Sequence, residues 1–318
     1  MVELLLVISV LMGLYLAWNI GVSTFGSTIG ISFGSTKIPK QTAVIFASIA
    51  AIFGVALLSN RVVDTISKDL IRLELSGLLS VLIAIVIIAT IIVYRGIPIS
   101  TTYVVVGAIG GYALISGAEI NFLTFEKVLI SMFLSPFGAL LIAFTIFYIM
   151  KSLFAKEYSS IRKIESFEMK FFLPGFIALL ILTFALGANS VGIVIGLLGG
   201  KISFSTLILI GVGGLILGII TWGSKTAHRL GVEFADLSPS RGFIAMLAAG
   251  LVMIAFVSTG IPVSTTQTLI GATVGVGLAR KNVNVMQALK VSLSWLIILP
   301  AALVIISMLL AGLIGFVL

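Results

Sequence analysis

The stretch Gly96-Ile-Pro-Ile-Ser-Thr-Thr102 returns almost unchanged as Gly260-Ile-Pro-Val-Ser-Thr-Thr266. The similarity continues past each copy, because a Gly-Ala pair follows at 107–108 and again at 271–272. Segments that recur at a constant offset indicate an internal duplication. We therefore predict that the chain consists of two related halves, each with one polar turn in an otherwise apolar environment.

Composition places these polar turns inside a membrane protein. Hydrophobic residues make up 60% of the 318 residues and charged residues only 9%, with a mean hydropathy of +1.30. Soluble proteins carry about 25% charged residues. A bilayer is spanned by about 17 to 25 apolar residues, and ten such runs occur at about 2–18, 39–59, 76–95, 97–118, 126–150, 171–190, 202–222, 241–259, 261–279 and 288–317. The expected fold is an all-α polytopic membrane protein with about ten crossings of the lipid bilayer.

The basic residues are distributed unevenly between the two sides of such a protein. If the N-terminus is outside, most of the 19 lysines and arginines are cytoplasmic, and only Arg61, Lys68, Arg72, Lys127 and Lys201 are outside. This distribution follows the positive-inside rule, so the net charge of +8 reports topology and not a nucleic-acid partner. We expect a multi-pass protein of the plasma membrane with both termini extracellular.

Five crossings in each half is an odd number, so the second half must run inverted relative to the first. Inverted repeats are common in secondary transporters, whose substrate site lies near the midplane where the repeats meet. We predict a first repeat over 1–150, a cytoplasmic linker over 151–170 and a second repeat over 171–318. The linker mixes basic and acidic residues and is interpreted as a solvated segment; the alternative is a lipid-headgroup or regulatory role.

Each repeated turn combines a helix-breaking proline with helix-capping hydroxyls. Pro98 and Pro262 lack an amide hydrogen, and serine and threonine are good N-caps. A helix that starts within the membrane presents unpaired amides and a positive dipole end, which together bind anions. The alternative is that the hydroxyls only cap or bond back to carbonyls in kinked helices. Two copies in a symmetric arrangement favour the anion site.

A second pair of glycine-rich segments contains Asn19 and Asn189. A buried asparagine is costly unless its amide is hydrogen-bonded, and neighbouring glycines allow the backbone to unwind, although they could equally serve close helix packing. Discontinuous helices are therefore expected near 19–26, 96–102, 187–196 and 260–266. The candidate substrate-binding residues are Asn19, Ser23, Ser100, Thr101, Thr102, Asn189, Ser190, Ser264, Thr265 and Thr266.

These motifs resemble those of the PiT family of inorganic phosphate transporters. That family repeats Gly-Ala-Asn-Asp-x-Ala-Asn and, later, Gly-[Leu/Ile]-Pro-Val-Ser-Thr-Thr in each half. The later motif is matched here at 96–102 and 260–266, whereas the Asp of the earlier motif is replaced by Ile20 in one half and Ser190 in the other. The family's Asp residues are implicated in cation binding, so the replacements bear on sodium coupling. The resemblance also implies a homodimer.

The run Asn19-Ile-Gly-Val-Ser23 is similar instead to the sulfate permease branch of the family, which has Asn-Ile-Gly-Ala-Ser in this place. Physical chemistry favours the same substrate. Phosphate near neutral pH keeps at least one proton and benefits from a carboxylate acceptor, whereas sulfate needs only donors. All eleven acidic residues are expected in loops or at the ends of spans. The main hypothesis is therefore sulfate import by alternating access.

Uptake of a dianion against 100 mV opposes about 4.6 kcal/mol, at roughly 2.3 kcal/mol per charge, so a coupled cation is required. Resemblance to the sulfate permeases implies a proton as that cation; a sodium-coupled phosphate symporter and a passive anion channel are the alternatives. An enzyme is not expected, because the chain has no cysteine, places its sole histidine, His228, outside the spans, and brings no paired carboxylates into the membrane. No cofactor or metal site is expected.

Overall fold

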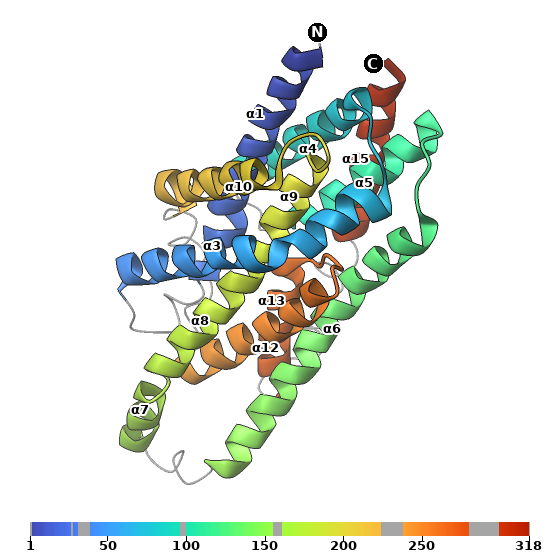
Figure 1. The fold of residues 1–318 in the computed structure, drawn as a ribbon. Helices are drawn as coiled ribbons and strands as arrows, with labels where there is room; N and C mark the ends of the chain where they lie inside the picture. Colours follow the sequence, from blue (N-terminus) through green and yellow to red (C-terminus); the bar gives the residue numbers. More distant parts are fainter. Residues whose placement is uncertain are drawn as a thin grey trace.

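Helices form nearly all of the structure, a computed structural model that describes residues 2–26, 28–30, 39–95, 100–154, 161–223, 238–279 and 299–317 (Figure 1). The elements are α1 (Val2–Ile20), η1 (Gly21–Phe25), α3 (Lys40–Asp64), η2 (Thr65–Leu70), α4 (Leu75–Arg95), α5 (Thr101–Ser116), α6 (Phe122–Leu153), α7 (Ile161–Met169), α8 (Phe172–Leu186), η4 (Gly187–Val191), α9 (Gly192–Leu197), α10 (Phe204–Gly218), η5 (Ile219–Gly223), α12 (Pro239–Ser258), α13 (Thr265–Ala279) and α15 (Leu299–Val317). The elements labelled η are π-helical turns. The expected all-α class is confirmed.

Six helical segments in the described part are long and apolar enough to cross a membrane. They cover Val2–Gly30, Gln41–Leu70, Phe122–Leu153, Phe172–Leu197, Phe204–Gly223 and Pro239–Ser258, and two shorter apolar helices cover Leu75–Ile91 and Thr101–Ser116. Two of the elements, α3 and α10, lie across the long axis of the molecule in Figure 1. The chain is a multi-pass membrane protein, and ten crossings remain a prediction.

The two Asn-containing segments do not break their helices, contrary to expectation. The chain passes from α1 into η1 with helical dihedrals at Ile20 (φ −61°, ψ −43°), and from α8 through η4 into α9 with helical dihedrals at Leu186 and Gly192. A π-turn adds one residue to the helical turn and loosens the local hydrogen-bond ladder without ending the helix. The predicted discontinuities near 19–26 and 187–196 are therefore wrong, because a widened turn accommodates the polar residues.

The repeated turn does interrupt the chain in its second copy, at Pro262-Val-Ser-Thr-Thr266. α12 ends at Ser258 and α13 begins at Thr265, and between them Gly260 has φ +79°, a left-handed conformation that side chains with a Cβ rarely adopt. In the first half Ser100 is extended (φ −78°, ψ 122°) and α5 begins at the next residue. Residues 96–99 lie outside the described part of the chain. The expected break near 260–266 is confirmed.

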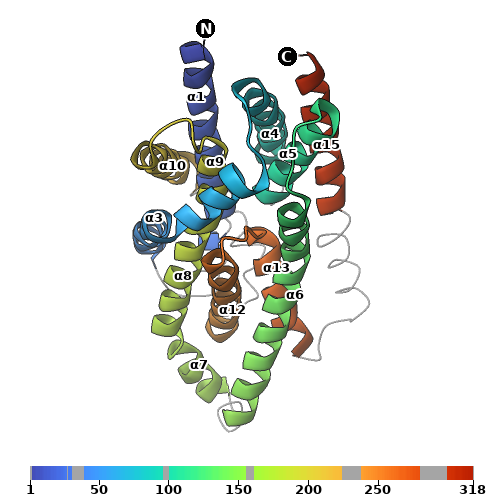
Figure 2. The same ribbon diagram turned by 45° about the vertical axis from the view of Figure 1, so that its right-hand side comes forward.

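The helices pack in corresponding pairs that join distant parts of the chain. α13 packs on α6, and α5 packs on α15; likewise α10 packs on α1, and α3 on α8 (Figure 2). Glycines set the closest approaches. A Cβ at Gly271 would overlap the carbonyl of Pro136, and a Cβ at Gly111 would overlap the backbone of Met308. Small residues at helix contacts are typical of membrane bundles, since they let backbones approach closely.

The apolar side chains of α3 are distributed as in a helix that faces lipid. Its alanines at 43, 47 and 51 are fully buried, whereas large apolar side chains on its other face, such as Phe53 and Leu57, are more than half exposed. Small residues inside and large apolar residues outside reverse the pattern of a soluble helix, in which the exposed face is polar. The exposed face of α3 is therefore a lipid-facing surface.

Two residues of the segment 151–170, Phe167 and Glu168, face the protein, whereas most of its other described residues are exposed. α7 within it buries Phe167, whose ring lies 5.0 Å from that of Phe171. The carboxylate of Glu168 accepts hydrogen bonds from the Ser240 amide (2.7 Å) and from the Ser238 and Ser240 hydroxyls (2.9 Å each), at the start of α12. A carboxylate there satisfies unpaired amides and complements the helix dipole. The predicted linker is thus attached to the start of α12 through Glu168.

Candidate functional site

Asn189 holds the turn before α13 in place. Its side chain is fully buried; Oδ1 accepts a hydrogen bond from the Val263 amide (2.9 Å), and Nδ2 donates to the Val263 carbonyl (2.8 Å) and to Thr265 Oγ1 (3.3 Å). The amide of Asn189 thus replaces the backbone partners that Val263 lacks outside a helix. The π-turn η4 positions this side chain, so the sequence-predicted Asn189 and Thr265 are brought together.

Two further hydroxyls connect the same turn to other elements. Ser190 and Thr265 share a hydrogen bond of 2.9 Å between their Oγ atoms, and Thr102 of α5 donates to the Val263 carbonyl over 3.1 Å. These hydroxyls therefore link different helices, in contrast to the alternative that they only bond back within one helix. Thr102 belongs to the first copy of the repeated motif and Val263 to the second, so the two motifs meet.

α6 also contacts both motifs, one turn before its internal proline, Pro136. Pro136 has no amide hydrogen, so the carbonyl of Met132 one turn earlier loses its helical donor. The hydroxyl of Tyr103 supplies that hydrogen bond at 3.1 Å. The residue before Met132, Ser131, donates its hydroxyl hydrogen to the carbonyl of Pro262 over 2.8 Å. α6 therefore positions the start of α5 through Tyr103 and the turn before α13 through Pro262.

The starts of α5 and α13 differ in their capping. Ser264 Oγ accepts a hydrogen bond from the Gln267 amide (3.3 Å) and so caps α13, whereas Ser100 occupies the N-cap position of α5 without a side-chain cap. The first amides of α5 therefore lack a capping side chain and can donate to an anion. Both serines and Thr266 are buried, and Thr101 is half-buried.

Asn19 and Ser23 form a separate polar pair. Asn19 Nδ2 donates to the Ala89 carbonyl on α4 (3.1 Å), and the Ser23 hydroxyl donates to the Asn19 carbonyl (2.7 Å). None of the hydrogen bonds between described residues connects this pair to the turn before α13. Ser23 thus behaves as the alternative interpretation expects, by bonding back to the carbonyl of the preceding helical turn.

The interior around these residues contains no charge in the part of the chain that is described. Its buried polar residues are serine, threonine, asparagine and glutamine. Acidic side chains with a described environment are exposed, except for the half-buried Glu168 at the start of α12. The candidate site therefore offers hydroxyls, carboxamides and backbone amides as ligands. His228, with its segment, lies outside the described residues.

Three side chains near the site were missed by sequence reasoning: Tyr103, Ser131 and Gln267. Tyr103 and Gln267 each follow a Ser-Thr-Thr triplet directly. Continuing the repeat by one residue would have found both. Ser131 carries no comparable signal, because only the packing of α13 on α6 brings it near Pro262.

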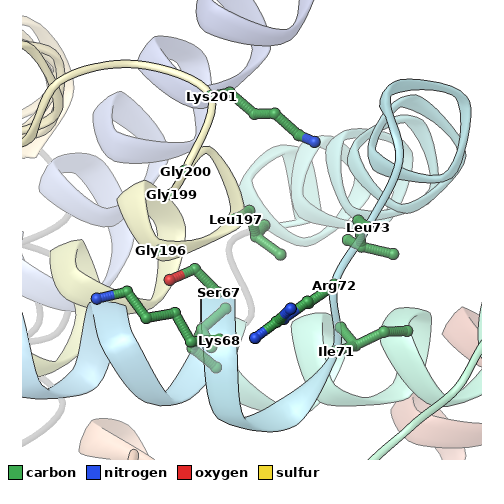
Figure 3. Close-up of a pocket in the computed structure, with 11 residues that line it drawn as sticks. Ser67, Lys68, Ile71, Arg72, Leu73, Gly196, Leu197, Gly199, Gly200 and Lys201 are labelled. Atoms are coloured by element: carbon green, nitrogen blue, oxygen red, sulfur yellow. The ribbon is translucent and has the colours of Figure 1, made fainter.

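A surface pocket of about 250 Å³ lies apart from this site, between η2 and the turn after α9 (Figure 3). Lys68, Arg72 and Lys201 line it, and these are three of the five cations expected on the extracellular side. Lys68 is paired with Asp64 at 2.7 Å, and the Ser67 hydroxyl donates to the Val63 carbonyl. The pocket therefore groups basic side chains at the surface, with Lys68 and Ser67 already engaged by protein atoms.

A family model described as the phosphate transporter family matches this chain twice, over residues 20–180 and 155–306. The chain belongs to the phosphate transporter family. The two matches cover both copies of the repeated motif. As a member of this family the protein is a transporter and not an enzyme.

Relatives of the phosphate transporter family align over nearly the whole chain. The "Putative phosphate permease" of Methanocaldococcus jannaschii is 29% identical, with 94% of each chain covered. A protein of the same name from Pyrococcus furiosus is 24% identical over 94% of this chain and 93% of its own length. A solved structure described as "The sodium-dependent phosphate transporter" is similar with a TM-score of 0.85, at 22% identity and 98% coverage of both chains. This last likeness shows that the fold is shared.

Proposed function

We propose that the protein imports inorganic phosphate together with sodium by alternating access. Family membership across both copies of the motif carries this proposal. The names of the relatives specify phosphate, and the solved structure with the same fold is that of a transporter described as sodium-dependent. Sulfate, the main hypothesis from sequence, is supported only by the run Asn19–Ser23 and by the absence of a carboxylate from the described interior. Proton coupling is supported only by the resemblance of this run to the sulfate permeases. Phosphate is therefore the better-supported substrate.

The proposed anion site lies where the starts of α5 and α13 approach each other. The bond from Thr102 to the Val263 carbonyl joins them, and both helices begin with Ser-Thr-Thr. Several neutral donors can hold an anion without binding it too tightly for release. Ser264 and Thr265 are shielded from solvent in this conformation, so transport requires a movement that exposes them. The remaining predicted ligands, Asn19 and Ser23, would join the site in another conformation or serve the cation.

The same proposal includes two inverted repeats, over 1–150 and 171–318, joined by the segment 151–170. Support comes from the corresponding helix pairs, since α13 packs on α6 as α5 packs on α15. α1 begins and α15 ends at the same end of the molecule, opposite α7, which agrees with termini on the extracellular side and a cytoplasmic linker (Figures 1 and 2). The homodimer stays a prediction.

Sodium would be bound by neutral oxygens. The π-turns η1 and η4 loosen the backbone ladder beside Ser23 and Ser190, and carbonyls freed from a helix are suitable sodium ligands. Without coupling, a phosphate dianion entering against 100 mV would oppose about 4.6 kcal/mol, from roughly 2.3 kcal/mol per charge. More than two sodium ions per dianion would make uptake electrogenic and driven by the membrane potential.

Uptake of labelled phosphate into proteoliposomes tests this function. With an inward sodium gradient we expect uptake several-fold above that with choline, competed by unlabelled phosphate and little by sulfate. Stimulation by an inward proton gradient with competition by sulfate alone would support the sulfate symporter instead. Flux that no cation gradient changes would indicate a passive channel. Empty liposomes are the control.

Ser100→Ala is expected to raise the KM for phosphate about ten-fold with little loss of thermal stability. The Ser100 hydroxyl caps no amide of its own helix, whereas a hydrogen bond to a charged ligand contributes about 1.5–3 kcal/mol. The matched control is Ser116→Ala at the other end of α5, where the side chain is exposed. Initial uptake rates over a range of phosphate concentrations provide the KM. An unchanged KM would remove Ser100 from the site.

A further inference from the structure

Gln267 is an unusual buried residue. Its side chain is 1% exposed, yet neither Nε2 nor Oε1 has a hydrogen-bond partner among the described residues. Ser135 Oγ is the one other buried side-chain atom in this part of the chain with the same property. An unpaired buried amide is costly, so such a group calls for an explanation when the polar side chains around it are paired.

The position of Gln267 places this amide at the proposed anion site. Its backbone amide bonds to Ser264 Oγ in the first turn of α13. One turn later Gly271 packs against the backbone of Pro136 on α6. Residues four apart share a helix face, so Gln267 lies on the side of α13 that meets α6. Ser135 also lies at this contact, next to Pro136.

The equivalent position in the first copy of the motif is used differently. Tyr103 and Gln267 are separated by the same 164 residues as Ser100 and Ser264. The Tyr103 hydroxyl is engaged by the Met132 carbonyl at 3.1 Å and also interacts with the Ser264 side chain. In the first copy of the motif, the additional polar group, the Tyr103 hydroxyl, is therefore already bonded to protein atoms. The second copy presents a free donor and a free acceptor beside the same helix starts.

We propose that Gln267 distinguishes phosphate from sulfate by recognising the proton that phosphate retains. Oε1 accepts the hydrogen bond of the protonated phosphate oxygen, and Nε2 donates to a second oxygen of the same ion. The carboxamide oxygen can only accept and its nitrogen can only donate, whereas a backbone amide only donates and a hydroxyl can rotate to donate to either anion. This inference rests on the proposed function of the site. It explains how a site with no carboxylate among its described residues selects phosphate.

The chemistry predicts a particular pattern of selectivity. Sulfate has no proton to donate, so its oxygens would face the lone pairs of Oε1 and leave that acceptor unpaired. A site built around a hydrogen bond rejects an analogue that lacks it much more strongly than a merely apolar site does. Arsenate carries protons as phosphate does and should therefore follow phosphate. Selectivity at Gln267 thus depends on protonation and not on the size of the anion.

The test compares the purified protein with Gln267→Leu and Gln267→Glu in proteoliposomes. Phosphate uptake is competed with arsenate and with sulfate, and the inhibition constants are compared. We expect Gln267→Leu to weaken phosphate and arsenate at least ten-fold while changing sulfate little, so that the preference for phosphate over sulfate falls. Gln267→Glu keeps an acceptor and is expected to keep that preference. Gln41→Leu, an exposed glutamine on α3, is the matched control.

The outcomes separate this inference from the proposed function. A wild-type protein that prefers sulfate would overturn both. A wild-type preference for phosphate that Gln267→Leu retains would overturn only the inference, as would an equal loss of affinity for all three anions. If Gln267→Leu does not fold, as judged by gel filtration and thermal unfolding, Gln267→Glu decides, because loss of its phosphate preference would also contradict the role of Oε1.

Discussion

Replacing Asn189 by leucine should lower phosphate uptake at least ten-fold and lower the Tm of the detergent-solubilised protein. The Asn189 side chain accepts the hydrogen bond of the Val263 amide and is one of two described donors to the Val263 carbonyl; the other is Thr102. Each buried group left unpaired costs about 1–3 kcal/mol. The turn that presents Ser264 and Thr265 would lose its fixed position, so the proposed anion site would be lost together with stability.

Two variants make this expectation specific. Asn60→Leu removes an exposed asparagine on α3 and should leave both uptake and Tm unchanged. Asn189→Asp keeps the acceptor for the Val263 amide but loses the donor, so an intermediate effect is expected. Uptake and thermal unfolding are measured on the same preparations. Normal transport by Asn189→Leu would show that the turn holds its shape without this clamp and would contradict the assignment.

Gly271→Ala is expected to destabilise the protein by about 1–3 kcal/mol, the usual cost of overpacking, and to abolish most uptake. The added methyl group would overlap the carbonyl oxygen of Pro136. Backbone atoms cannot rotate away as a side chain can, so α13 must move off α6. That movement would displace the Ser-Thr-Thr triplet and Gln267, which lie on the same helix.

The matched control is Gly213→Ala on α10, where no atom lies within 4 Å of the added methyl group. There alanine should be neutral or stabilise the helix by about 0.5–1 kcal/mol, because glycine is the more flexible residue. Thermal unfolding of both variants in the same detergent measures the difference. Equal Tm values for the two variants would show that α13 and α6 do not depend on their close contact.

Much of the fold could be predicted because membrane helices are encoded locally. An apolar run of sufficient length forms a helix in lipid, since every backbone group must find its partner within the segment. The break at Gly260–Ser264 could also be predicted, because proline restricts its own φ angle and glycine allows a positive φ angle. Whether the Asn19 and Asn189 segments break their helices could not be predicted from the sequence. A π-turn and a full break share the same glycine-rich composition, and neighbouring helices decide between them.

The candidate site was predicted in part. Asn189, Ser190, Thr102 and Thr265 were expected from the two motifs, and hydrogen bonds join all four to one turn or to each other. Asn19 and Ser23 carry the same signals but lie against α4 instead. Two similar motifs thus make different contacts, because residues that are equivalent in sequence meet different neighbours.

The membrane class, the repeated motif and the neutral, hydroxyl-rich character of the candidate site follow from composition and spacing, which are properties of short stretches of chain. Which polar groups meet is a property of packing. The bond from Thr102 to Val263 joins residues 161 positions apart, and the Tyr103 hydroxyl finds its acceptor on another helix because Pro136 leaves the Met132 carbonyl without a helical donor. Tertiary structure alone left the amide of Gln267 without a described partner beside those contacts, since burial and hydrogen bonding depend on atoms that are remote in sequence.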